Sequence, residues 1–203
     1  DADILMVAIG GGGLAAGVAQ CAKQINPNIK IIGVEPEGAQ CMKEALKFGK
    51  PVELSKVSTI ADGTAVKLAG QRTFELLNGV IDEIVTVSDY ELMDAFLVLV
   101  EKHKLIAETS GILTLAGLQK IKKKSKKVVS IVSGGNIDVL TISSMITKGL
   151  VSRGRIFSFS VDLTDKPGEL VKVSEILSTQ NANVIKLNHN QFKNLDRFTH
   201  VQL

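Results

Sequence analysis

The sequence predicts an α/β fold built on a parallel sheet, followed by a smaller α+β unit at the C-terminal end. Short continuous apolar runs alternate with segments whose apolar residues recur at helical spacing, a pattern typical of buried parallel strands with helices on both faces. The first apolar run leads straight into four glycines, Gly10–Gly13, and then into a helix. From about residue 152 apolar and polar residues alternate instead, which predicts a half-exposed strand and a second domain.

The first segment is predicted to run strand, loop, helix, strand, helix. The apolar runs Ile4–Ile9 and Ile29–Val34 predict buried parallel strands, and the stretch Leu14–Ile25 predicts the helix between them. On this helix Cys21 shares an apolar face with Leu14, Val18 and Ile25, so we expect a buried thiol, as in a reducing compartment. The next helix is predicted over Ala39–Phe48, ended by Gly49 and Pro51.

Helix and strand continue to alternate up to about residue 150. Ser88, followed three residues later by Glu91, predicts a capping box at a helix start. The lysine run within 120–127 carries no interleaved aromatic residue, so we interpret it as a solvated helix end before a strand. The predicted helices are Val66–Leu77, Ser88–His103, Thr109–Ile121 and a helix through Ile146 that stops at Gly149; the predicted strands are Glu83–Val87 and Val128–Val132.

A composition break at residues 152–154 separates two predicted domains, 1–151 and 152–203. In the second domain Arg155–Leu163 predicts an amphipathic strand, and residues 164–168 predict a turn. A helix is predicted over Glu169–Gln180 with Leu170, Val173, Ile176 and Leu177 inward, followed by strands over Ala182–Leu187 and Phe198–Leu203. Because an open sheet edge at a terminus favours aggregation, we expect the domain to continue beyond Leu203.

Composition and charge narrow the class of protein. Hydrophobic residues make up 45% of the 203 residues, and the formal net charge of +3 is too small to indicate a nucleic-acid partner. No apolar run reaches the ~18 residues of a membrane span, and no signal peptide precedes the first apolar run. We therefore expect a cytoplasmic protein without a membrane or nucleic-acid partner. Because the sequence opens on Asp1 without a methionine, we also expect a fragment.

The glycine loop predicts a phosphate site, because glycines allow backbone N–H groups to approach a ligand and the following helix N-terminus favours an anion. Gly10-x-Gly12-x-x-Ala15 also fits a dinucleotide fingerprint, with Glu35 about 20 residues on as a ribose ligand, so an NAD-binding Rossmann module stays open on these residues. A second glycine turn, Ser133–Asn136, follows another predicted strand. Two such turns at one sheet edge suit a compact cofactor that has a phosphate and a ring.

Four ordered motifs resemble those of the fold-type II pyridoxal phosphate (PLP) enzymes, within them the threonine dehydratase, serine dehydratase and serine racemase group. The motifs are residues 7–17 around the glycine loop, Ala61–Val66, Ala107–Gly111 and Ser133–Asn136. The resemblance implies that this chain is the parallel-sheet, C-terminal half of a PLP-dependent threonine dehydratase (threonine ammonia-lyase) that converts L-threonine to 2-oxobutanoate and ammonia, as in isoleucine biosynthesis. A serine dehydratase or racemase activity is the alternative within the family.

The resemblance also implies site residues. Backbone N–H groups of Gly10, Gly11, Gly12, Gly13 and Leu14 would bind the cofactor phosphate, the Ser133 hydroxyl would bond the pyridine nitrogen, and Gly63 and Glu108 would lie near the ring. No lysine in this sequence lies in a matching motif, so the Schiff-base lysine is absent, no catalytic residue is assigned here, and we expect the chain alone to be inactive.

Two further expectations concern metal and regulation. Some relatives hold a divalent cation near Glu35, the Ala39 carbonyl and an acid two residues beyond, but Cys41 stands at that last position, so no metal site is predicted. The tail resembles a truncated, ferredoxin-like ACT domain, which implies allosteric amino-acid binding by Asp165, Gly168 and Asn183 in a homo-oligomer, either a dimer or a tetramer.

Overall fold

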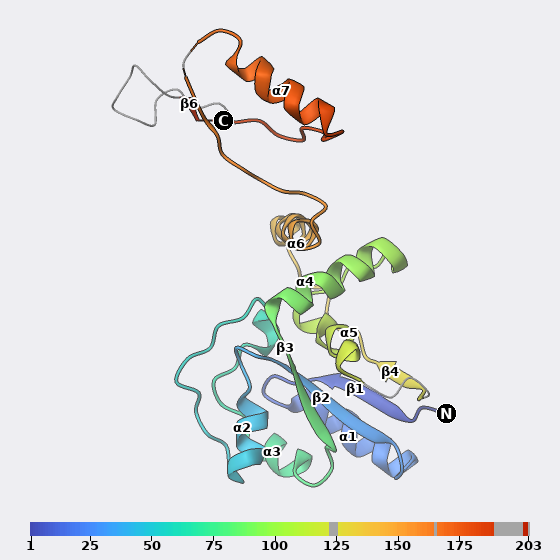
Figure 1. The fold of residues 1–203 in the computed structure, drawn as a ribbon. Helices are drawn as coiled ribbons and strands as arrows, with labels where there is room; N and C mark the ends of the chain where they lie inside the picture. The colour runs from blue at the N-terminus through green and yellow to red at the C-terminus, as the bar shows by residue number, and fades with distance from the viewer. Residues whose placement is uncertain (122–125, 165, 189–200, 203) are drawn as a thin grey trace. The chain divides into compact units, whose positions relative to one another are not determined.

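The computed structural model describes residues 1–121, 126–164, 166–188 and 201–202 and divides into two compact units, residues 1–156 and 157–203. The first unit contains a four-stranded parallel sheet, and the second contains a short ladder and one helix (Figure 1). In the part of the chain that is described, no helix is both long and apolar enough to cross a bilayer.

The parallel sheet of the first unit has the order β3-β2-β1-β4. Strand β1 (Ile4–Ala8) pairs with β2 (Lys30–Pro36) on one side and with β4 (Val128–Ser130) on the other, and β3 (Glu83–Val87) lies beyond β2. The chain therefore adds strands to one side of β1 and then crosses to its other side. In open α/β sheets the carboxyl ends of the strands at such a reversal form the usual ligand crevice.

The two faces of the sheet are covered by separate helix layers (Figure 1), because alternate residues of β1 face opposite sides. Val7 and Ile9 pack into the core that includes α1 (Gly13–Ile25), α2 (Cys41–Phe48) and α3 (Gln71–Leu77). Met6 and Ala8 pack into the other core. That second core includes residues of α4 (Asp89–Val98) with its π-helical extension η2 (Leu99–His103), of the short helices η3 (Ser110–Ile112) and α5 (Leu113–Gly117), and of α6 (Val139–Ser152). The short helix η4 (Leu118–Lys120) follows α5 and has no buried residue.

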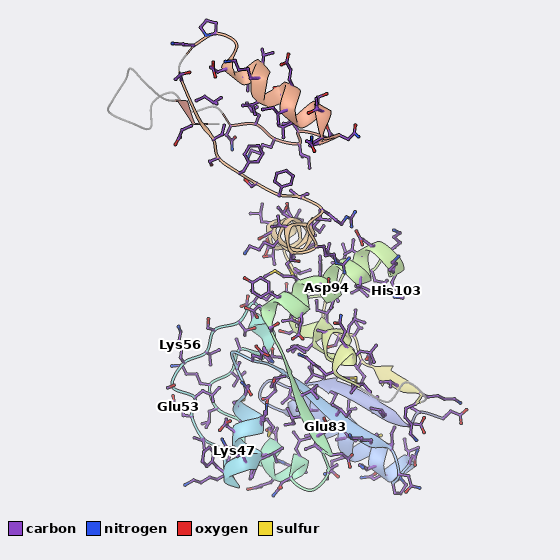
Figure 2. The ribbon with its side chains drawn as sticks, in the orientation of Figure 1. Lys47, Glu53, Lys56, Glu83, Asp94 and His103 are labelled. Atoms are coloured by element: carbon purple, nitrogen blue, oxygen red, sulfur yellow. The ribbon has the colours of Figure 1, made fainter. Side chains whose placement is uncertain are left out.

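Most predicted elements of the first unit are confirmed, and two of the predicted residue signals for the start and end of a helix are present. The Ser88–Glu91 capping box is present at α4, and Gly49 ends α2 with φ 71°. Helix α6 extends through Ser152, however, although a stop at Gly149 was predicted. A Cβ on Gly149 would lie 2.6 Å from Leu97 Cδ1, so this glycine serves close packing of α6 against α4. Arg153, after α6, donates from Nε to Oδ1 of Asp94 at 2.6 Å. Figure 2 labels Asp94 on α4.

Two predictions on the α1–α3 layer are wrong. The helix predicted from Val66 begins only at Gln71, because the Lys67 carbonyl accepts the Leu54 N–H and Gly70 is the extended N-cap. Cys21 is exposed, not buried. Helix α1 packs through its small residues Ala15, Ala16 and Ala19, and the ends of the predicted apolar face are exposed, Leu14 to 49% and Ile25 to 81%.

The second unit is less regular than predicted. Of Arg155–Leu163 only β5 (Asp162–Leu163) is a strand, antiparallel to β6 (Val201–Gln202), and Ala182–Leu187 is not a strand. Most of the strand predicted over 198–203 lies outside the described residues. Helix α7 (Glu169–Thr179) confirms the predicted helix, but none of its residues is buried, and Ile176 is 64% exposed. A two-residue ladder offers too little sheet surface to cover an apolar helix face.

Candidate functional site

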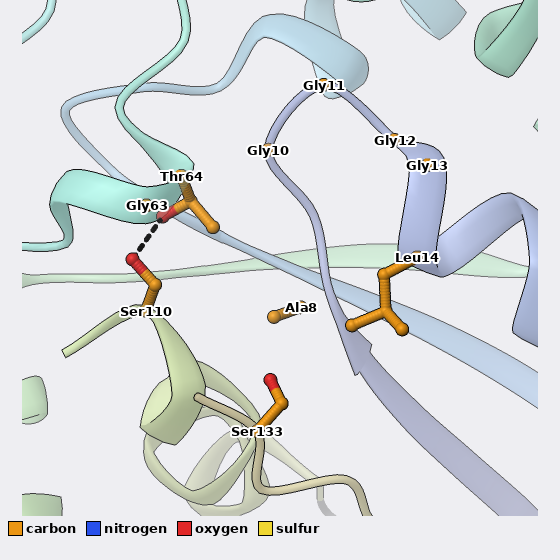
Figure 3. A pocket seen from close by; sticks show the side chains of 10 residues that line it. All are labelled: Ala8, Gly10, Gly11, Gly12, Gly13, Leu14, Gly63, Thr64, Ser110 and Ser133. Carbon is orange, nitrogen blue, oxygen red and sulfur yellow. Dashed lines mark hydrogen bonds between the residues drawn. The ribbon is translucent and has the colours of Figure 1, made fainter. Parts of the chain in front are cut away.

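The candidate site is a pocket of about 210 Å³ at the carboxyl ends of β1 and β4, where the order in which the chain adds strands reverses (Figure 3). The glycine loop, the turn after β4, and two segments of the intervening chain meet there. Ten described residues line it, none of them charged: Ala8, Gly10, Gly11, Gly12, Gly13, Leu14, Gly63, Thr64, Ser110 and Ser133.

The carbonyl groups of Gly10, Gly11 and Gly12 accept hydrogen bonds from residues that do not line the pocket. The Gly10 carbonyl accepts from the Cys41 thiol at 3.5 Å, the Gly11 carbonyl from the Thr73 hydroxyl at 2.5 Å, and the Gly12 carbonyl from the Ala16 N–H at 2.8 Å. In a trans peptide the C=O and the following N–H point in opposite directions. The N–H groups of Gly11, Gly12 and Gly13 therefore point away from these partners, on the side where the pocket lies.

These N–H groups are free to bind a ligand, since within the described residues they donate no hydrogen bond to protein. They lie at the start of α1, where unpaired N–H groups and the helix dipole favour an anion. Gly12 has φ 93°, and a Cβ there would lie 2.6 Å from Met42 Cε and 2.9 Å from Thr73 Oγ1. At Gly11 and Gly13 no protein atom lies within 4 Å of the Cβ position, so protein packing does not require glycine there.

Ser133 faces the glycine loop from the other side of the pocket, with its hydroxyl directed inward (Figure 3). Its N–H donates to the Gly111 carbonyl at 3.1 Å, and the next residue, Gly134, takes φ 74°. Glu108 does not line the pocket. Its carboxylate accepts the Asn136 N–H at 3.2 Å and its own N–H donates to the Gly134 carbonyl, so Glu108 holds the second turn in place.

Thr64 and Ser110 also bring hydroxyl groups to the pocket. Neither was predicted from the sequence as a site residue, although they lie within the motifs Ala61–Val66 and Ala107–Gly111. Thr64 Oγ1 donates to the Ala61 carbonyl at 3.0 Å and lies 3.5 Å from Ser110 Oγ (Figure 3). Ser110 is 5% exposed. A Cβ on Gly63 would approach Ser110 Oγ to 3.0 Å, so glycine at 63 leaves this wall of the pocket open.

Glu35 is fully buried and is turned toward α2. Its Oε1 accepts the Met42 N–H at 2.8 Å and its Oε2 accepts the Lys43 N–H at 2.9 Å. Burial raises the pKa of this carboxyl to about 7, against the lowering effect of the two N–H bonds. Because Glu35 is fully buried and both of its oxygens bond the start of α2, its carboxylate is not presented to a ribose hydroxyl, which tells against the NAD interpretation. The described residues contain no cluster of three or more His, Cys, Asp or Glu that could hold a metal ion.

Two of the three predicted regulatory residues lie in the described part of the second unit. Gly168 is the N-cap of α7 with φ 95°, and Asn183 is exposed. No hydrogen bond joins these two residues within the described part of the unit. Asp165 lies outside the described residues.

Residues 1–134 match the family model described as pyridoxal-phosphate dependent enzyme. The L-threonine ammonia-lyase of Thermotoga maritima is 41% identical over 192 residues, 94% of this chain and 48% of that protein. The L-threonine dehydratase biosynthetic IlvA of Haemophilus influenzae is 38% identical over 89% of this chain and 36% of that protein. The chain thus spans about half or less of the length of the curated relatives that it matches.

Solved structures of similar sequence also share the fold. The processed form of threonine deaminase isoform 2 from Solanum lycopersicum superposes with a TM-score of 0.68 and 40% identity over 72% of this chain and 44% of that chain. Maize serine racemase superposes with a TM-score of 0.65 and 35% identity over 73% of this chain and 48% of that chain. The matched residues 1–134 include the whole glycine loop and the first two residues of the second turn, Ser133 and Gly134. The chain belongs to the family of pyridoxal-phosphate dependent enzymes.

Proposed function

We propose that this chain is part of a threonine ammonia-lyase, which converts L-threonine to 2-oxobutanoate and ammonia. The observation that carries the proposal is the pocket itself, which sets the free N–H groups of the glycine loop opposite the neutral Ser133 hydroxyl, at the point where the strand order reverses. Threonine is favoured as the substrate because relatives named for threonine ammonia-lyase or dehydratase match over most of this chain.

The residues present fit PLP. Its phosphate would lie on the N–H groups of Gly10–Leu14 at the start of α1, in a lining that contains no carboxylate to repel it. When bound, the cofactor supplies an electron sink for the bond-breaking at the substrate Cα. Ser133 would bond the ring nitrogen, and a neutral hydroxyl there favours an unprotonated ring. The open wall at Gly63 would lie beside the ring, and Glu108 would act by holding the turn that carries Ser133.

Catalysis in this proposal needs a lysine that this sequence does not contain in a matching motif, so the chain alone would be inactive. Residues 1–151 would form the C-terminal part of the catalytic domain, and residues 152–203 a truncated ACT-like regulatory domain. Asp165, Gly168 and Asn183 would bind an amino-acid effector in a cytoplasmic homo-oligomer. The support for this regulatory role is the sequence resemblance and the position of Gly168 at the start of α7.

The proposal is tested by assaying the full-length, PLP-loaded enzyme with L-threonine and with L-serine. Formation of 2-oxobutanoate at a higher kcat/KM than that of pyruvate from serine is the expected result. The likeness to maize serine racemase makes serine the informative comparison. A preference for serine, or racemisation of serine without loss of ammonia, would move the protein to the other branch of the family, and no turnover of either amino acid would contradict the proposal.

A further inference from the structure

We infer that Thr73 is a positioning residue for the phosphate-binding loop, one that acts through the backbone of Gly11. This inference rests on the proposed function, because it assumes that the glycine loop binds the cofactor phosphate. Thr73 lies on α3, more than sixty residues beyond the loop in the sequence, and does not line the pocket.

The contact between Thr73 and the loop is short and specific. The Thr73 hydroxyl donates to the Gly11 carbonyl at 2.5 Å and also lies 3.0 Å from the Gly70 carbonyl in its own helix turn. The Gly70 N–H reaches the same Gly11 carbonyl at 3.4 Å, beyond the usual length of a strong N–H···O bond. The hydroxyl is therefore the main donor that fixes this carbonyl.

Fixing the Gly11 carbonyl fixes the direction of the Gly12 N–H, because the two belong to one planar trans peptide. Glycines on both sides leave this peptide without Cβ atoms that would hinder its rotation. The neighbouring Gly10 carbonyl has a weaker support, the Cys41 thiol at 3.5 Å. Burial and the nearby Glu35 raise the pKa of that thiol to about 11, so it stays protonated as a donor.

The same geometry explains a polar residue on a helix face that otherwise packs inward. Phe74 and Leu77 of α3 are buried in the core beside α1, whereas Thr73 is half-buried and turned to the loop. Replacing Thr73 by valine keeps the branched shape and removes only the donor. The Gly11 peptide could then rotate, and the phosphate would lose one aligned N–H group.

The test measures binding of PLP and of pyridoxal, which lacks the phosphate, to the full-length apoenzyme. We expect Thr73→Val to raise the Kd for PLP about 10- to 100-fold, the range for losing one hydrogen bond to a charged group, and to change the Kd for pyridoxal less than about twofold. Thr73→Ser restores the hydroxyl and should bind PLP nearly as wild type does. Thr147→Val is the matched control, since among the described residues the exposed Thr147 hydroxyl bonds within its own helix alone, to the Ser143 carbonyl.

The possible outcomes separate this inference from the proposed function. If the wild type binds PLP and pyridoxal equally well, the glycine loop is not the phosphate site and the proposed function fails with the inference. If the wild type prefers PLP and Thr73→Val keeps that preference, the inference alone is overturned. A parallel loss of PLP and pyridoxal binding would show a general structural role and also overturn it. Should Thr73→Val fail to fold, Thr73→Ala removes the same donor without added bulk and is judged by the same ratio.

Discussion

Replacing Gly12 tests the loop where its backbone is most constrained. Gly12 has φ 93°, and holding a side chain in such a conformation costs about 1–3 kcal/mol. The added Cβ would also lie 2.6 Å from Met42 Cε and 2.9 Å from Thr73 Cβ, and overpacking of this kind costs about 1–3 kcal/mol. Because Met42 Cε is the flexible end of its side chain, we expect Gly12→Ala to lower the free energy of unfolding by about 2–4 kcal/mol.

Gly13→Ala is the matched comparison. No atom lies within 4 Å of its Cβ position, and Gly13 is the first residue of α1, so alanine there should leave the unfolding free energy of the apoenzyme unchanged or raise it by up to about 1 kcal/mol. Both variants should weaken PLP binding, and Gly12→Asp should abolish cofactor retention because it adds a negative charge beside the phosphate. Urea unfolding of the full-length apoenzyme and absorbance titration with PLP measure the two effects. Full cofactor occupancy in Gly12→Asp, or equal destabilisation by both alanines, would refute the reasoning.

Three further predictions concern the ring side, the buried acid and the tail. Ser133→Ala should lower kcat about 5- to 150-fold, for a loss of about 1–3 kcal/mol, while PLP stays bound; an unchanged kcat would remove Ser133 from the site. The pKa of Glu35 is about 7 in the folded chain, against an ordinary 4.5, so protonated Glu35 stabilises the fold below pH ~4.5, and this stabilisation of at most about 3 kcal/mol is lost as the pH rises to ~7. Glu35→Gln should therefore flatten the pH dependence of the unfolding free energy over this range, and an unaltered pH profile would contradict the raised pKa. Calorimetry of the full-length protein with isoleucine, valine, threonine and serine should detect an effector, and Asp165→Ala with Asn183→Ala should abolish its binding; a double variant that binds and responds as wild type would end the regulatory proposal.

The sheet and most helices of the first unit could be predicted because local signals and tertiary packing agree there. The capping residues at Ser88 and Glu91, Gly49 and the apolar strand runs act within a few residues of each other. Predictions failed where packing partners decide the outcome. An apolar stripe on α1 predicted that Cys21 is buried. Instead α1 packs against the sheet through its alanines, because small residues allow the helix to approach closely, and Cys21 is exposed.

For the candidate site too, local motifs could be predicted from the sequence, whereas contacts from distant elements could not. The glycine loop and Ser133 could be found from the sequence because their motifs follow strands whose carboxyl ends meet at one edge. Thr73 and Cys41 could not, since they act from behind the loop and from other elements. Glu35 could not be assigned from spacing alone either, because its distance from the loop fits a ribose ligand as well as the helix-capping role that its two N–H bonds reveal.

A crystal structure of the full-length enzyme with PLP would show whether the backbone of the glycine loop binds the cofactor phosphate. We expect phosphate oxygens within about 2.7–3.2 Å of the N–H groups of Gly11, Gly12 and Gly13, with the pyridine nitrogen on the Ser133 hydroxyl. A phosphate bound elsewhere, or one held by basic side chains while these N–H groups face solvent, would contradict it.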